Sequence, residues 1–123
     1  MAVDWMRLLQ GPDFAIDGNA VLVHLGKRSH KLHLEDRGES LQLRAVVLQP
    51  ATARTIPDRA LRAWRRNRIT PLVGFRLDKR QLLIAEAWVP KVGLTAEELR
   101  LYARAVASES DRFEFELTGK DVE

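Results

Sequence analysis

The chain has 123 residues and no cysteine, and 20 lysine and arginine residues outnumber 17 aspartate and glutamate residues, which gives a formal charge of +3. The missing cysteine excludes disulfides, thiolate zinc sites and cysteine nucleophiles. With 46% hydrophobic and 30% charged residues, the composition is that of a globular chain. This length predicts one domain over residues 1–123.

The first residues do not have the pattern of a secretion signal. Asp4 and Arg7 lie within the first turns, and Gly11-Pro12 follows, so no apolar segment of the required length precedes the glycine. No apolar run approaches the roughly 20 residues that cross a bilayer. Together with the absence of cysteine, these features predict a cytoplasmic protein with no membrane partner.

Residues 3–10 predict a short helix that ends at Gly11-Pro12. Trp5, Met6 and Leu9 are spaced to share one face of this helix. A helix of this length is not stable by itself, so we expect it to dock on another element.

Strand patterns dominate the next part of the chain. A short β-rich segment at 14–16 and a turn precede an apolar run at 20–25. Apolar and polar residues then alternate over 29–35 and again over 40–48. Because the connections are short, residues 20–48 predict a three-stranded antiparallel meander.

A second helix is predicted over 57–68, with Thr55 as a plausible cap and Pro57 in the first turn. Its apolar stripe is narrow and is formed by Ala60, Leu61 and Trp64. The remaining surface carries a basic patch of Arg59, Arg62, Arg65, Arg66 and Arg68. This patch makes a nucleic-acid-binding domain the alternative to a protein-binding one.

A hairpin of strands at 72–77 and 81–89 follows, and its second strand is apolar on both faces. One face carries Leu82, Ile84 and Trp88, and Glu86 is the only charged residue of the strand. The other face carries Leu83, Ala85, Ala87 and Val89. Such a strand needs cover on both faces. A second subunit is the simplest cover, and folding of residues 49–57 or of the first helix over this face is the alternative.

The last helix begins with a capping box, in which Thr95 is the cap and Glu98 reaches back to it. We expect it to end between residues 110 and 118, because 113–117 also alternates as a strand would. Residues 109–123 hold six acidic against two basic residues, whereas 54–68 hold six arginines against one aspartate. These segments can pair within the fold or between subunits.

No motif in the chain requires catalysis to explain it. The seven glycines are too far apart for a phosphate-binding loop. His30 and His33 are three apart on a predicted strand and therefore face opposite sides, although His24 and His33 could meet across the hairpin near Glu35. We predict no catalytic residues, no metal site and no cofactor, and hence a protein that is not an enzyme.

The element order, together with the stretches VGFRLD (73–78), LLIAEAWVP (82–90) and GLTAEEL (93–99), resembles the YbjN and type III secretion chaperone-like family. The resemblance implies an α+β fold, with an antiparallel sheet of about five strands flanked by helices in the order α-β-β-β-α-β-β-α. Secretion chaperones are typically acidic and this chain is basic, which favours the YbjN-like branch.

The resemblance also implies a cytoplasmic homodimer without a cofactor that binds an extended segment of a client protein. Among the apolar residues, we expect Trp5, Met6 and Leu9 of the first helix to contact the client. Trp64, Phe75 and Trp88 are expected in or near the dimer interface. The predicted function is therefore chaperone-like or regulatory binding of a peptide or protein segment.

Overall fold

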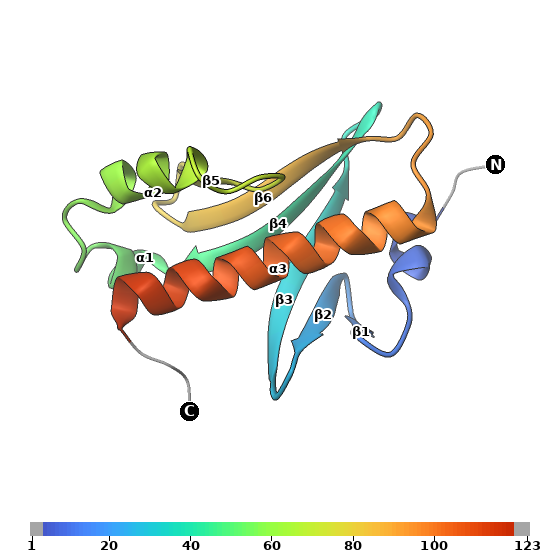
Figure 1. The fold of residues 1–123 in the computed structure, drawn as a ribbon, viewed down its shortest axis with the longest axis horizontal. Helices are drawn as coiled ribbons and strands as arrows, with labels where there is room; N and C mark the ends of the chain where they lie inside the picture. The colour runs from blue at the N-terminus through green and yellow to red at the C-terminus, as the bar shows by residue number, and fades with distance from the viewer. Residues whose placement is uncertain (1–3, 120–123) are drawn as a thin grey trace.

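A computed structural model describes residues 4–119 of the chain. Its strands are β1 (Phe14–Asp17), β2 (Ala20–Leu25), β3 (Arg28–Asp36), β4 (Ser40–Leu48), β5 (Gly74–Leu77) and β6 (Leu83–Pro90). Its helices are the 3-10 helix η1 (Trp5–Leu9) and the α-helices α1 (Pro50–Ala53), α2 (Arg59–Asn67) and α3 (Ala96–Thr118). The strands form one antiparallel sheet in the order β1-β2-β3-β4-β6-β5, and α3 lies across one face of it (Figure 1).

The predicted α+β class and element order are confirmed, with six strands instead of about five. The additional strand is β1, which forms a full hairpin with β2. The helix α1 was not predicted. Pro50 begins α1, where a missing N–H breaks no helical hydrogen bond.

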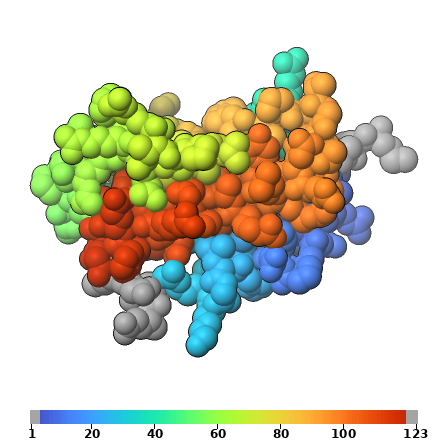
Figure 2. Space-filling view, in the orientation of Figure 1, coloured from blue at the N-terminus to red at the C-terminus, as the bar shows by residue number. Residues whose placement is uncertain are grey.

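The core lies between the sheet and α3. On β6 the residues directed toward the helix are all buried, namely Leu83, Ala85, Ala87 and Val89. From the helix, Leu99, Val106 and Phe113 are buried against them at helical spacing. Figure 2 shows this face of the molecule, where α3 and α2 cover the sheet and the β2–β3 hairpin projects beyond them.

Local chemistry determines where α3 begins and ends. The Glu98 N–H donates to Thr95 Oγ1, and the Thr95 N–H donates to Glu98 Oε1, so the predicted capping box is present. Gly119 ends the helix with a φ of 67°, a conformation that glycine adopts without strain. The alternative of a strand at 113–117 is wrong, because Phe113 and Leu117 are buried whereas Phe115 between them is exposed.

The sheet splits between β3 and β4. Residues 33–36 of β3 pair with residues 41–44 of β4, whereas residues 28–32 of β3 pair with β2 alone. In Figure 1, β3 and β2 diverge from β4 beneath α3. A cavity of about 500 Å³ lies at this split, and its walls include residues of β3, β4, α1 and α3.

Candidate protein-binding surface

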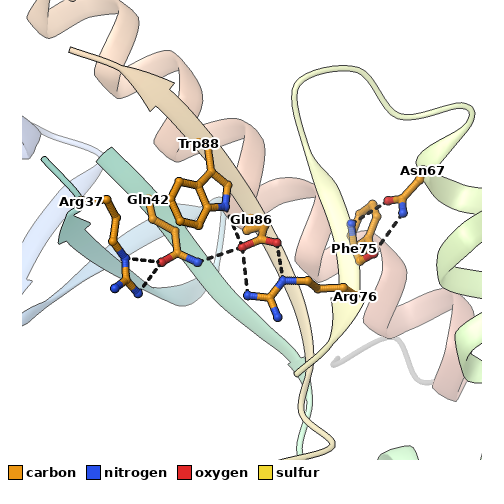
Figure 3. A network of polar contacts seen from close by, with 7 residues as sticks. All are labelled: Arg37, Gln42, Asn67, Phe75, Arg76, Glu86 and Trp88. Carbon is orange, nitrogen blue, oxygen red and sulfur yellow. Dashed lines mark hydrogen bonds and ion pairs between the residues drawn. The ribbon is translucent and has the colours of Figure 1, made fainter. Parts of the chain in front are cut away.

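The face of the sheet opposite α3 carries a polar network centred on Glu86 of β6 (Figure 3). Gln42 Nε2 and Trp88 Nε1 donate to Glu86 Oε1 at 2.8 and 3.1 Å, and Arg76 Nε donates to Glu86 Oε2 at 2.5 Å. Arg37 extends the network by donating to Gln42 Oε1 from Nε and Nη2. These side chains come from β4, β5, β6 and the turn after β3, so the network ties the strands together across their outer face.

Strand register explains why these residues meet. Gln42 of β4 lies opposite Trp88, and Glu86 lies between Arg44 on β4 and Gly74 on β5. Because alternate residues of a strand share a face, Glu86 and Trp88 are directed away from α3. Gln42 is buried even though it is on this outer face, and its amide is fully engaged by Glu86 and Arg37.

Trp88 is 54% exposed on this face, and the Arg37 guanidinium lies 5.9 Å from the centre of its ring. Neither of the two segments that could have covered this face from within the chain does so. The helix η1 contacts α3 and β1 instead, and Ala53 and Ile56 of the 49–57 segment pack into the core. The apolar surface that the sequence predicted for this face is larger than the one present, however, because Ile84 is buried within the chain itself. Trp88 is therefore the main apolar group that this face offers to a partner.

The charge of Glu86 is stabilised by its donors. Burial by itself would raise the pKa of Glu86, but hydrogen bonds from Arg76, Gln42 and Trp88 outweigh burial and hold the pKa below its ordinary value. The carboxylate therefore stays ionised, with its oxygens already bonded, and this arrangement suits a fixed binding surface better than a proton-transfer site.

We expect Glu86→Gln to lower the free energy of unfolding by about 1–2 kcal/mol at neutral pH. A carboxyl whose folded pKa is depressed stabilises the fold above its unfolded pKa, near the ordinary value of 4.5, and this contribution is lost as the pH falls through the folded pKa. Urea unfolding at several pH values should show that the free energies of unfolding of wild type and of Glu86→Gln become equal in acid. Glu39→Gln, at an exposed turn position, is the control, and a difference from wild type that stays constant with pH would contradict the assignment.

The orientation of α2 differs from the prediction. Leu61 and Trp64 were expected to face the core, but Trp64 is 57% exposed and Leu61 is also exposed. Ala63 and Arg66 face inward instead, and the Arg66 guanidinium lies 5.7 and 5.1 Å from the ring centres of Phe75 and Phe113. A long aliphatic stem and a planar cation fill this contact, so the apolar residues of α2 are left on the surface.

Three arginines of the predicted basic patch are engaged by contacts within the fold. Arg66 pairs with Glu109 and Glu116 of α3 at 3.2 and 2.6 Å, and Arg62 Nη2 donates to the Glu116 carbonyl. Arg59 donates to the Ile56 carbonyl, while Arg65 and Arg68 remain exposed. The expected pairing of the basic and acidic segments thus occurs within the fold. It removes Arg66 from any surface that could contact phosphates and disfavours the nucleic-acid alternative.

The predicted client-binding residues of η1 differ in exposure. Leu9 is fully buried in the core and offers no surface to a client. Trp5 and Met6 are half-buried and line a hollow of about 170 Å³ together with Leu34 and Leu41. Only these two residues of the predicted set can contact a partner without unfolding η1.

The residues predicted for a dimer interface also separate. Phe75 is buried and makes an edge-to-face contact with Phe113, with ring centres 4.9 Å apart. Its expected interface role is corrected to a core role, because no part of the ring reaches a partner. Trp64 and Trp88 are both exposed, so only these two of the three residues are available to a second subunit.

Asn67, the last residue of α2, covers the outer edge of β5. Its Nδ2 donates to the Phe75 carbonyl at 3.0 Å, and its Oδ1 accepts from the Phe75 N–H at 2.6 Å (Figure 3). One side-chain amide thus satisfies both backbone groups that a further strand would use at this position. The contact protects this edge of the sheet against strand addition.

Replacing Asn67 by alanine should lower the free energy of unfolding by about 1–3 kcal/mol, because two backbone groups of Phe75 lose their partner. The same change should speed amide exchange at Phe75, as measured by hydrogen–deuterium exchange. Arg65→Ala, on an exposed position of the same helix, is the matched control and should change stability by less than about 0.5 kcal/mol. Equal effects of the two substitutions would rule out the edge-capping role.

Comparison with solved structures shows that the fold occurs in a known protein. No protein-family model and no curated protein matches the chain. A chain in the solved structure described as the HopA1-SchA chaperone-effector complex superposes with a TM-score of 0.54 and 20% sequence identity. The match covers 95% of this chain and 89% of that one. The two chains share a fold.

No helix within residues 4–119 combines the length and apolar character needed to cross a membrane.

One group of polar residues was missed by the sequence analysis. His30 of β3 lies beside Asp111 and Glu114 of α3, with one potential ligand atom from each residue within 4.8 Å of the others. The possible meeting of His24 and His33 across the hairpin does not occur, since His24 pairs with Ser29 near the hairpin turn and His33 pairs with Ala20 at the other end. The i, i+3 spacing of the two acidic residues was visible in the sequence, but their proximity to His30 depends on how α3 crosses the sheet.

Proposed function

We propose that this chain is a chaperone-like, non-enzymatic protein-interaction domain that acts as a cytoplasmic homodimer and binds an extended segment of another protein. The observation that carries the proposal is the exposure of Trp88, a large aromatic side chain held by a polar network on an otherwise uncovered sheet face. Tryptophans of this kind are enriched among the residues that dominate binding energy at protein interfaces.

We assign the interface with the second copy of the chain to Trp88 and to the exposed apolar side of α2. Leu61 and Trp64 are exposed on α2, and the segment that follows the helix adds two more exposed large hydrophobic residues, Ile69 and Leu72. Arg68 lies 5.2 Å from the centre of the Trp64 ring and restricts its motion, which lowers the entropy lost on binding. A patch of this kind on a small chain indicates an interface.

We assign the surface that binds the client segment to Trp5 and Met6 of η1. The hollow beside these residues has apolar walls from Leu34 and Leu41 and an acidic rim from Asp4 and Asp36, of which Asp36 already pairs with Lys91. The hollow fits one apolar side chain of an extended segment that also carries a lysine or arginine close to that side chain. The shared fold with a chain of a chaperone-effector complex supports this general role, and the finer assignment to the YbjN-like branch rests on the sequence resemblance alone.

An array of short synthetic peptides, probed with the labelled full chain, tests client binding. We expect binding to peptides with alternating apolar residues and a nearby lysine or arginine, and at least a tenfold loss of signal with Trp5→Ala. Arg7→Ala, at an exposed position of the same helix, should bind as wild type does. The proposal fails if no peptide is bound, or if both variants lose binding equally.

A further inference from the structure

His30, Asp111 and Glu114 form a compact set of nitrogen and oxygen donors at the split between β3 and β4. Asp111 and Glu114 are three residues apart and therefore project from one side of α3. All three side chains are half-buried, and His30 comes from the strand that diverges from the rest of the sheet. The fold thus concentrates an imidazole and two carboxylates from segments more than seventy residues apart.

The surroundings of His30 resemble those of a metal-binding histidine. Its Nε2 lies 3.3 Å from the Val46 carbonyl oxygen and 2.9 Å from Ser110 Oγ. Histidines that bind metals usually donate their second ring N–H to a carbonyl or another acceptor, which fixes the ring and its tautomer. One ring nitrogen lies within 4.8 Å of a ligand atom of each carboxylate, and with the proton on Nε2 the lone pair that can bind a cation is on Nδ1.

The two carboxylates differ in their partners. Arg28 Nη2 donates to Asp111 Oδ2 at 2.6 Å, which orients Asp111 and leaves its second oxygen as a ligand. Within the part of the chain that the structure describes, no hydrogen bond or ion pair within 4 Å reaches the Glu114 carboxylate, and only the nearby charges of His30, Arg28 and Asp111 act on it. A half-buried carboxylate without such a partner is stabilised by a bound cation.

The cavity at the sheet split gives access to this set. Its volume is about 500 Å³, and both His30 and Glu114 line it. Gln49, Thr52 and Thr118 add polar groups to its walls. Water molecules can therefore reach a cation at this position and complete its coordination.

We propose that His30, Asp111 and Glu114 bind a divalent transition-metal ion of the Zn²⁺ class, with water in the remaining position. One imidazole nitrogen with two carboxylate oxygens suits such an ion, whereas Mg²⁺ and Ca²⁺ prefer oxygen ligands alone. The donor atoms lie within 4.8 Å of one another and must approach by up to about 1.5 Å to reach zinc–ligand distances of roughly 2.0–2.2 Å, which requires side-chain rotation. The ion would connect β3 to the C-terminal part of α3 where strand pairing is lost.

Calorimetric titration of the full chain with ZnCl₂ tests this site. We expect one saturable site of micromolar affinity, and a rise in melting temperature of roughly 5–10 °C when Zn²⁺ exceeds its dissociation constant about 100-fold. MgCl₂ should give no saturable heat. Glu114→Gln keeps the size of the side chain and should weaken Zn²⁺ binding at least tenfold, as should His30→Asn.

His24→Asn is the matched control, because His24 is an exposed histidine of the neighbouring strand and should leave Zn²⁺ affinity unchanged. Visible absorption of bound Co²⁺ gives a second readout, and its bands should be lost in Glu114→Gln while circular dichroism confirms that this variant is folded. The proposal is overturned if wild type binds no Zn²⁺ saturably, or if the Glu114 and His30 variants bind it as wild type does.

Discussion

Replacing Phe113 by alanine should lower the free energy of unfolding by about 3–5 kcal/mol. Phe113 is buried where α3 meets the sheet, and its ring contacts Phe75 edge to face. It also supports the guanidinium of Arg66, whose ion pairs join α2 to α3. The substitution therefore opens a cavity and also loosens the attachment of α2.

Phe115→Ala is the matched control for this experiment. Phe115 is on the same helix two residues further on, but it is 44% exposed. Its replacement should lower stability by less than about 1 kcal/mol, because little apolar surface is removed from the core. Urea unfolding followed by circular dichroism measures both values. Similar losses for the two variants would mean that the 113–117 segment is not packed as described.

Replacing Trp88 by glutamate should raise the dissociation constant of the proposed homodimer by about 30-fold or more. Truncation of a central interface tryptophan commonly removes 2 kcal/mol or more of binding energy, and the substitution also introduces a carboxylate beside Glu86. Sedimentation equilibrium over a range of protein concentrations measures this constant. Because Trp88 is exposed in the single chain, the variant should keep its secondary structure.

Leu101→Glu provides the control, since Leu101 on α3 is 54% exposed, the same fraction as Trp88. It places a carboxylate on an apolar surface position outside the outer sheet face, and it should leave the dissociation constant unchanged. If Trp88→Glu and Leu101→Glu dimerise equally well, the outer face of the sheet is not the interface.

Much of the fold could be predicted from the sequence because its signals are local. Alternation along 40–48 indicated a strand and its inward face, the apolar run at 81–89 indicated a second strand, and the capping box at Thr95 indicated the start of α3. The short helix α1 was missed because its four residues are too few to show a helical pattern.

The orientation of α2 could not be predicted, because simple polarity patterns treat arginine as a surface residue. Arg66 has a 14% exposed side chain, packs on two aromatic rings and forms two ion pairs, and this outweighs the burial of Leu61 and Trp64. The network at Glu86 was partly visible, as the only charge on an apolar strand. Its donors Arg37 and Arg76 come from other elements and required the sheet register.

Site residues that depend on tertiary contacts were the least predictable. The grouping of His30 with Asp111 and Glu114 requires α3 to cross the point where β3 leaves β4, and no local pattern encodes this crossing. In the same way, Leu9 shares the apolar face of η1 with Trp5 and Met6, yet only the packing of η1 shows which of them the core encloses.

Light scattering on the 123-residue chain during size-exclusion chromatography tests the central claim most directly, namely that the exposed face around Trp88 is a surface for another protein chain. At micromolar concentration we predict a mass of twice the 14.0 kDa of one chain. A mass of 14.0 kDa at every concentration tested would contradict this account.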